Sequence, residues 1–179
     1  RLCLVSEKEE DAAVRAAVVR ALGDVPATPQ TLAAIDAALA DPDAAVRLAA
    51  AKVTRARQKD APVILVRMAR DSDPAIRAWC LDEMASASSA MAGADDAIRQ
   101  AITDDHADVR IAAVHCAAIR QVAGWDHAAT LLRLSSGTDA RERSIALAAA
   151  ARLRVTECAD TARKLLADAD GAVRAEALS

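Results

Sequence analysis

The residues able to do chemistry in this chain are three histidines, four cysteines, and aspartates and arginines that recur along its 179 residues. His115 and Cys116 are adjacent, and Cys80 supplies a further metal-binding residue type. Adjacent helical residues point about 100° apart, and the sequence contains no C-x-x-C or H-x-x-x-H pair of the kind that holds zinc. The sequence therefore predicts no metal ion and no cofactor. We interpret the cysteines as reduced, half-buried residues and His115 as a surface residue.

The aspartates and arginines are of the types used in acid–base catalysis, but they recur six times, whereas catalysis needs one site. We therefore assign them to structure. Serine, cysteine and histidine are not clustered with a basic partner, as a nucleophilic site requires. Gly124 and Gly137 are isolated, so no glycine-rich phosphate loop is present. The sequence predicts a protein without enzymatic activity.

The recurring residues belong to a seven-residue motif, D-x-D-x-x-V-R, which occurs at 41–47, 71–77 and 168–174 and in looser form at 9–15, 104–110 and 137–143. Its arginines are Arg15, Arg47, Arg77, Arg110, Arg143 and Arg174, spaced by 32, 30, 33, 33 and 31 residues. Self-similarity at such a period is the signature of a repeat array.

Each copy of the motif predicts a turn that starts a helix. Four residues before the arginine stands an aspartate in five of the six copies, which are Asp11, Asp43, Asp73, Asp139 and Asp170. A short acceptor at this position caps free N–H groups of a helix, and Pro74 suits a first helical position. Apolar residues then follow at helical spacing, as in Ile76, Cys80, Leu81 and Met84.

Helices are expected at 11–23, 31–40, 43–58, 62–70, 73–87, 95–103, 107–123, 126–135, 139–153, 159–167 and from 170 onward. This pattern predicts an all-α fold, an α-solenoid of stacked antiparallel helix pairs with about five to six repeats in one array over 1–179. Alanine dominates the 54% hydrophobic content, which suits helices that each bury a modest stripe against their neighbours. Leu2, Leu4, Val5, Val173 and Leu178 lack a covering repeat, so we expect a part of a longer array or end-to-end pairing.

Charge and hydropathy narrow the classes of partner. The chain has 23 basic and 26 acidic residues and a formal net charge of −3, which calls for no polyanionic partner. No apolar run approaches the length of a membrane span. We therefore expect a cytoplasmic protein that binds neither membrane nor nucleic acid.

The motif, followed by alanines and repeated in phase, resembles HEAT-like repeats, in particular the short bacterial type named after phycobilisome lyases. The resemblance implies that the helix after each motif lines a concave face. It also implies a ladder between neighbouring repeats, in which Asp41, Asp71, Asp104 and Asp168 meet Arg47, Arg77, Arg110 and Arg174. The chain departs from the pattern at Gly137 and Glu142 in the fifth copy and at His106 in the fourth. These departures predict reduced regularity and a bend there.

The inner face is expected at the positions 2, 5, 6 and 9 residues after each arginine. Its predicted partner-binding residues are Trp79, Asp82, Glu83, Lys52, His115, Ile119 and Arg152. Val53, Cys116 and Ile145 belong to the same positions. Trp79 stands where other copies hold Ala or Ile, and it is interpreted as either an exposed anchor or a plug between alanines. Trp125 is interpreted as a packing cap.

The leading functional hypothesis is a non-catalytic scaffold that binds a partner protein or peptide on the concave face. Two alternatives stay open. The resemblance allows a bilin lyase-like subunit, although no tetrapyrrole pocket is evident. Some alkylpurine DNA glycosylases are also built of HEAT-like repeats and use tryptophan with an acidic residue, as Trp79 and Glu83 would provide. Only three basic residues line the inferred face, whereas a nucleic-acid groove is dominated by Lys and Arg.

Overall fold

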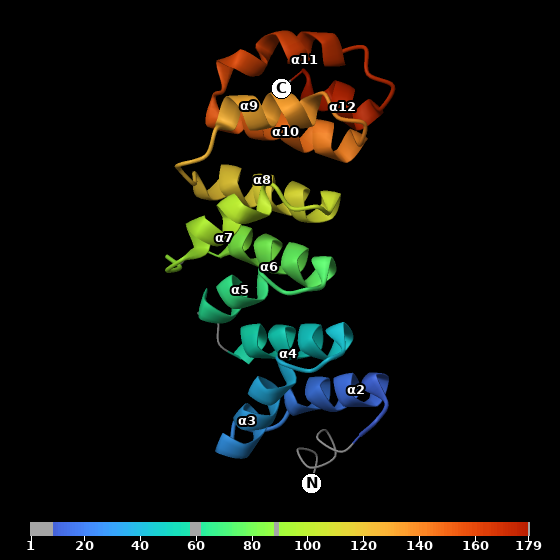
Figure 1. The fold of residues 1–179 in the computed structure, drawn as a ribbon, viewed down its shortest axis with the longest axis vertical. Coiled ribbons are helices and arrows are strands. Elements are labelled where there is room, and N and C mark those ends of the chain that lie inside the picture. The colour runs from blue at the N-terminus through green and yellow to red at the C-terminus, as the bar shows by residue number, and fades with distance from the viewer. Residues whose placement is uncertain (1–8, 58–61, 88–89, 179) are drawn as a thin grey trace. The chain divides into compact units, whose positions relative to one another are not determined.

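The computed structural model describes residues 9–57, 62–87 and 90–178, and every regular element in these ranges is a helix (Figure 1). The all-α prediction is therefore confirmed. The chain divides into two compact units, Arg1–Met68 and Ala69–Ser179, and each is described by itself. Predicted positions at Leu2, Cys3, Leu4 and Val5 lie outside the described residues.

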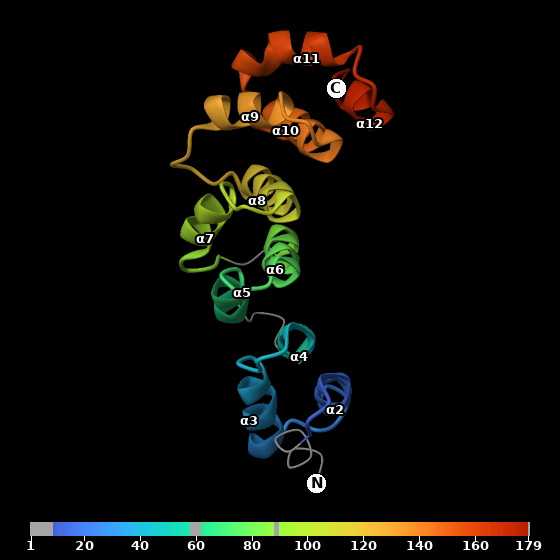
Figure 2. The ribbon, with the colours of Figure 1, turned by 45° about the vertical axis from the view of Figure 1, so that its right-hand side comes forward.

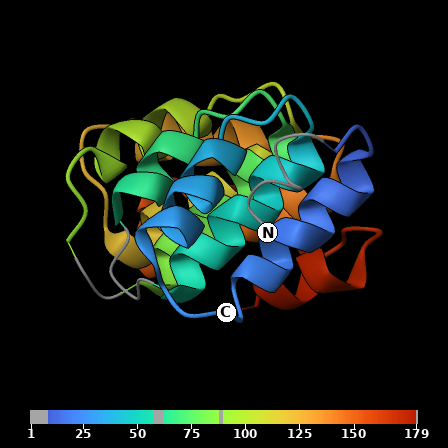
Figure 3. The same ribbon diagram turned by 90° about the horizontal axis from the view of Figure 1, so that it is seen from below.

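Unit 1 contains α2 (Ala12–Leu22), α3 (Pro29–Ala38), α4 (Ala44–Arg57) and α5 (Pro62–Met68). The helices that follow the motif, α2 and α4, pack against each other, α3 contacts both of them, and α5 contacts α4. Figure 3 shows α2 and α4 running side by side. We call the helices that follow the motif the row helices.

Unit 2 contains α6 (Pro74–Ser86), α7 (Ala94–Ala101), α8 (Ala107–Arg120), α9 (His127–Ser135), α10 (Ala140–Leu153), the 3-10 helix η1 (Thr156–Cys158), α11 (Ala159–Leu165) and α12 (Gly171–Glu176). The row helices pack in chain order, α6 on α8, α8 on α10 and α10 on α12. In Figure 2, α7 and α9 lie to one side of α6, α8 and α10. Each packs against the row helix that follows it, α7 on α8 and α9 on α10.

The motif starts the row helices by the expected capping. Asp11, Asp73, Asp139 and Asp170 are N-caps whose carboxylates accept backbone N–H groups of the first turn. Asp43 accepts the Ala45 N–H at 2.8 Å in the same way. The fourth copy differs because His106 makes no side-chain cap hydrogen bond there.

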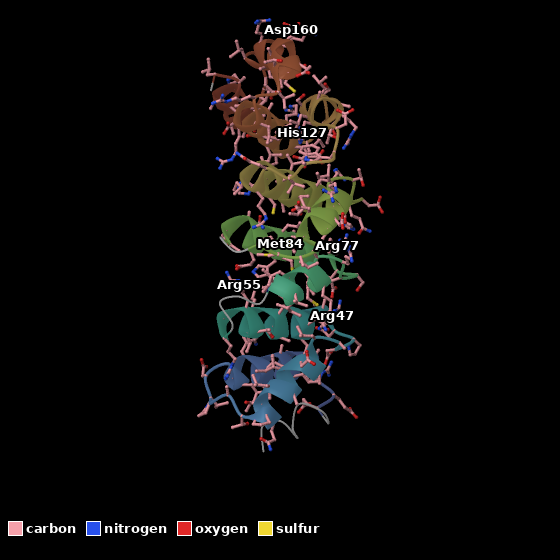
Figure 4. The ribbon with its side chains drawn as sticks, turned by 90° about the vertical axis from the view of Figure 1, so that its left-hand side faces the viewer. Arg47, Arg55, Arg77, Met84, His127 and Asp160 are labelled. Atoms are coloured by element: carbon pink, nitrogen blue, oxygen red, sulfur yellow. The ribbon has the colours of Figure 1, made fainter. Side chains whose placement is uncertain are left out.

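The expected core positions are confirmed. Val46, Ile76, Leu81 and Val109 are all buried. Met84, labelled in Figure 4 with Arg77 near the other end of α6, is buried as well. The row helices thus bury the aliphatic residue before the motif arginine and the stripe that continues it.

Val14 is an exception to this burial, and two other positions differ from expectation. Val14 is 41% exposed, because no helix before α2 packs against it within the described residues. Val173 is buried, since α12 packs against α10, whereas Leu178 is exposed as predicted. α8 was expected to extend to residue 123 before a break at Gly124, but it ends at Arg120 because Gln121 adopts the left-handed conformation with φ 53°.

The expected ladder between motif residues of neighbouring copies is present. Arg15 forms two hydrogen bonds of 2.9 Å to the carboxylate of Asp41, which belongs to the next copy. Arg77 pairs in the same bidentate way with Asp104, and Arg143 with Asp168. The ladder thus joins neighbouring copies as expected, with Asp41, Asp104 and Asp168 each bound by the arginine of the preceding copy.

Within one copy the arginine instead contacts backbone. The Nη1 of Arg47, labelled in Figure 4, donates to the carbonyl oxygens of Asp41 and Pro42 at 2.9 and 3.0 Å. Asp41 in turn accepts the Asp43 N–H at 2.8 Å. The fork of five guanidinium donors allows each motif arginine to hold its own turn and the next one together.

The fifth copy keeps the ladder by exchanging two residues. Its first aspartate is replaced by Gly137, and its aliphatic residue is replaced by Glu142. Glu142 is buried and accepts from Arg110 Nε at 2.6 Å, so it substitutes for the missing aspartate. A side chain built at Gly137 would start 3.7 Å from Glu142 Oε2, which places the carboxylate near the same space. α10 is a regular helix, so the predicted loss of regularity is wrong for this helix.

A second set of arginines ties the opposite ends of the row helices. Arg57 donates to the carbonyl oxygens of Leu22 and Val25 at the end of α2. Arg120 donates to Met84 O and Ala87 O, both at 3.1 Å. Free carbonyls at a helix C-terminus favour such cations. Because neighbouring row helices are joined at both ends, they run in the same direction.

Candidate interaction face

The exposed stripe of the row helices is narrower than predicted. Five residues after the motif arginine, Lys52, Asp82 and His115 are exposed, as expected for an outward position. Six residues after it, however, Val53 and Cys116 are buried, so neither adds an exposed side chain to the stripe as predicted. The reason is that neighbours pack on both sides of a row helix and leave only one line of side chains in solvent.

Trp79 of α6 is half-buried. Ile76, three residues before Trp79, and Cys80, the residue after it, are both buried. Trp79 therefore presents part of its ring to the surface while the remainder packs on the protein. Glu83, one turn later, is also half-buried. Trp125, in contrast, is a packing cap as expected, because its Nε1 donates to Val122 O at 3.0 Å and its ring meets His127 edge-on at a centroid distance of 4.3 Å.

Asp82 of α6 and His115 of α8 are close enough to interact electrostatically. Burial raises the pKa of the Asp82 carboxyl above its ordinary value, and Glu83 raises it further, while His115 opposes the shift. The carboxyl stays on the exposed stripe. The structure thus brings together two of the predicted site residues from adjacent helices.

A hollow of about 330 Å³ opens over α8, α10 and α12. Its apolar lining includes Ile111, Ile145, Ala148 and Ala172. Ile145 was predicted on this face, but Ile111 was not, because it stands one residue after the motif arginine and that position was left out. The signal was present in the sequence, since Ile111 replaces the alanine found one residue after Arg15 and Arg77.

The charges around this hollow have both signs. Arg141 contacts Asp108 at 2.6 Å and Asp139 at 2.9 Å, with its side chain 63% exposed. Arg152, at the other end of α10, is exposed and donates from Nε to Ala118 O at 3.2 Å. This contact places Arg152 beside Ile119, which is half-buried at the end of α8.

These side chains lie on three helices that pack in order, α6 on α8 and α8 on α10, and together they make up one candidate surface. We call it the α6–α8–α10 face, and it consists of Trp79, Asp82, Ile111, His115, Ile119, Ile145 and Arg152. Lys52 is exposed on α4 of unit 1, so its place on the same face stays a prediction.

The thiols do not belong to this face. Cys80, Cys116 and Cys158 are free and buried, so the half-buried interpretation is wrong. Burial raises the pKa of Cys80 and of Cys116 to about 12, which keeps both thiols neutral and poorly nucleophilic. Within the described ranges, no three His, Cys, Asp or Glu side chains gather in a group able to hold a metal ion.

Comparison with known proteins identifies the fold alone. No family model matches the chain, and no curated protein matches it. The solved structures similar to it include two engineered proteins. One is 16% identical with a TM-score of 0.63, and the match covers 99% of this chain and 95% of that one. The second is 18% identical with a TM-score of 0.56, covering 99% of this chain and 93% of that one. None of the described helices has the length and apolar character that a membrane span requires.

Proposed function

We propose that this chain is a HEAT-like α-solenoid that acts as a protein-interaction scaffold and binds a partner segment on the α6–α8–α10 face. Two features support the HEAT-like assignment: the Asp–Arg ladder, and the hydrogen bonds that join neighbouring row helices at both ends. Three free, buried cysteines suit a reducing compartment, which supports a cytoplasmic location.

The observation that carries this proposal is the set of large apolar side chains on the exposed stripe. In a chain rich in alanine, Trp79, Ile111, Ile119 and Ile145 are half-buried on three adjacent helices. Partly exposed aromatic and aliphatic residues with charged neighbours are typical of interface cores and their rims. A structural role alone would not require four large residues along the stripe that faces solvent.

The chemistry of the face indicates the kind of partner. Asp82 and Glu83 stand beside Trp79 at the α6 end, so a basic residue in the partner would find complementary charge there. Trp79 offers an apolar surface with few rotors to fix on binding. The partner segment is therefore one that combines an apolar anchor with a basic residue.

The same chemistry weighs against the alternative functions. Asp82 of the face and its neighbours Glu83 and Asp108 balance Arg152 of the face and the nearby Arg141, whereas a DNA-binding groove concentrates Lys and Arg. Trp79 is the one tryptophan among the residues of this face, and the chain has no Phe or Tyr, so the face offers few aromatic contacts to a bilin. Tight, salt-sensitive binding of duplex DNA would overturn the scaffold proposal in favour of the glycosylase-like one.

The test is a peptide library selected on the purified chain, followed by titration of the enriched peptides against variants. Trp79→Ala should weaken binding by roughly 2 kcal/mol or more with an unchanged melting temperature. The matched control is Leu166→Ala, which removes a 42% exposed leucine at the end of α11. If Trp79 is instead a plug, Trp79→Ala will leave peptide affinity unchanged and lose about 3–5 kcal/mol of stability.

A further inference from the structure

Unit 1 carries a separate hollow of about 530 Å³ beside α4 and the end of α2. Its floor is apolar and made mostly of small side chains, namely Ala45, Leu48, Ala49, Val53 and Ala56. They lie at positions 45, 48, 49, 53 and 56, with Lys52 among them on the same side of α4, so the lined stretch spans about 16 Å of the helix. Alanines along such a stripe permit close approach of another helix.

The end of α2 closes one side of this hollow through a close contact. A Cβ atom built at Gly23 would lie 3.2 Å from a Val53 methyl group, so glycine allows α2 to end against α4. Arg57 then holds this end by donating to Leu22 O and Val25 O. The walls of the hollow are thus fixed by packing and by hydrogen bonds, and no rearrangement is needed to open it.

The rim of the hollow is basic on both row helices. Arg20 and Lys52 each stand five residues after their motif arginine, so they occupy the same level of α2 and α4. Both are exposed. The Arg20 guanidinium makes no hydrogen bond or ion pair with the described residues, while its carbonyl oxygen accepts the Gly23 N–H at 2.9 Å. Asp24 is the one acidic side chain that lines the hollow.

In unit 2 the residues at the same position of the row helices are neither Lys nor Arg. There the position five residues after the arginine holds Asp82, His115 and Ala148. The basic pair is therefore a property of unit 1 and not of the repeat. An apolar floor about three turns long, with Lys52 on the floor helix itself and Arg20 on the neighbouring α2, complements an amphipathic helix that carries carboxylates beside its apolar stripe.

We propose that the hollow between α2 and α4 binds an acidic amphipathic helix of a partner protein, with its apolar stripe on α4 and its carboxylates beside Arg20 and Lys52. This site is distinct in residues and in charge from the α6–α8–α10 face, which favours a basic partner segment. The chain then has two binding surfaces of opposite preference.

The experiment uses the full chain and two fluorescent peptides with the same leucines at helical spacing, one with flanking glutamates and one with flanking lysines. Fluorescence anisotropy should show saturable binding of the glutamate peptide alone. The variant Arg20→Glu/Lys52→Glu should weaken that binding by at least about tenfold and bind the lysine peptide instead. Arg67→Glu, an exposed arginine on α5 outside the hollow, is the matched control and should leave binding unchanged.

Melting temperatures accompany each titration, and Arg20→Gln and Lys52→Gln replace the double reversal if it does not fold. Equal affinity for the two peptides, or an equal loss with Arg67→Glu, would overturn the proposal. Tighter binding of a duplex oligonucleotide than of the glutamate peptide would also overturn it. So would occupation of the hollow by a second copy of the chain, which would appear as a sedimentation coefficient that rises with protein concentration in the parent and not in the Lys52 variant. Since Trp79→Ala leaves this hollow intact, failure here is distinguishable from failure of the α6–α8–α10 face.

Discussion

The exchange of Gly137 and Glu142 makes a quantitative prediction about the junction between α8 and α10. Glu142 and Arg110 have side chains only 10% and 19% exposed, and their Nε–Oε1 distance is 2.6 Å. Removing one member of a buried pair leaves the other charge uncompensated, at a cost of about 3–5 kcal/mol. Arg110 would keep its hydrogen bonds to Asp104 O and Asp105 O at 2.7 and 2.9 Å. We therefore expect Glu142→Val to lose about 3 kcal/mol, the lower end of that range.

A second substitution, at Gly137, should restore the Asp–Arg pairing that other pairs of row helices have. Gly137→Asp alone adds a carboxylate close to Glu142 and should destabilise the protein by about 1 kcal/mol. Its Cβ also lies 3.2 Å from Leu134 O, so the preceding helix end must shift slightly. Combined as Gly137→Asp/Glu142→Val, the two changes place an aspartate opposite Arg110 and a valine in the core, as Asp104 and Val109 do in the fourth copy.

Urea denaturation followed by circular dichroism measures the four corners of this double-mutant cycle. The double variant should lie within about 1 kcal/mol of the parent, which gives a coupling energy of about 3 kcal/mol between the two sites. Asp160→Val, at an exposed pair with Arg163, is the control and should change stability by less than about 1 kcal/mol. Additive losses from the two single changes would refute the idea that Glu142 replaces the motif aspartate.

Three further predictions concern the ladder, the helix ends and the thiols. Hydrogen bonds from Arg15 and Arg143 hold the pKa of Asp41 and Asp168 below 3.8. At Asp104 desolvation raises the pKa, but the hydrogen bonds from Arg77 and from the His106 N–H, together with the Arg77 charge, outweigh it, so this pKa is lowered as well. A carboxyl whose pKa is lower in the folded than in the unfolded state stabilises the fold at pH values above its unfolded pKa. Melting temperatures should therefore be flat above about pH 5 and fall as the pH drops through and below 3.8. Arg120→Ala should cost about 1–3 kcal/mol by leaving Met84 O and Ala87 O without their donor, against no change for the exposed Arg133→Ala. Cys80 and Cys116 should resist alkylation until the protein unfolds, and rapid labelling of the native state would contradict their burial.

The sequence by itself located nearly all the described helices, because the signals that start them are local. An aspartate, a first-turn residue such as Pro74 and an aliphatic stripe act within one turn of their own helix, so the motif predicts each start to within a residue or two. Helix ends were less accessible. α8 ends where Gln121 adopts the left-handed conformation, which its residue type does not predict. The helix was predicted to continue to residue 123 because Gly124 follows there.

Pairing between copies was decided by the tertiary structure. The sequence shows an aspartate and an arginine in each copy, and it does not say whether they meet within a copy or across two. Stacking of the row helices brings Arg77 to Asp104, 27 residues away, while the turn of its own copy offers only carbonyl oxygens. The exchange at Gly137 and Glu142 is invisible without that geometry, because it looks like two separate departures from the motif.

The candidate binding surfaces divide in the same way. Sequence alone determined which positions point outward at five residues after the arginine, since helical periodicity fixes Lys52, Asp82 and His115 opposite the core stripe. Only the tertiary structure decided that Cys116 is buried and that Ile111 lines a hollow. The physical reason is that two neighbouring helices bury residues at both margins of a helix's solvent-exposed side. How many residues they bury depends on where the helices are placed, and not on residue type.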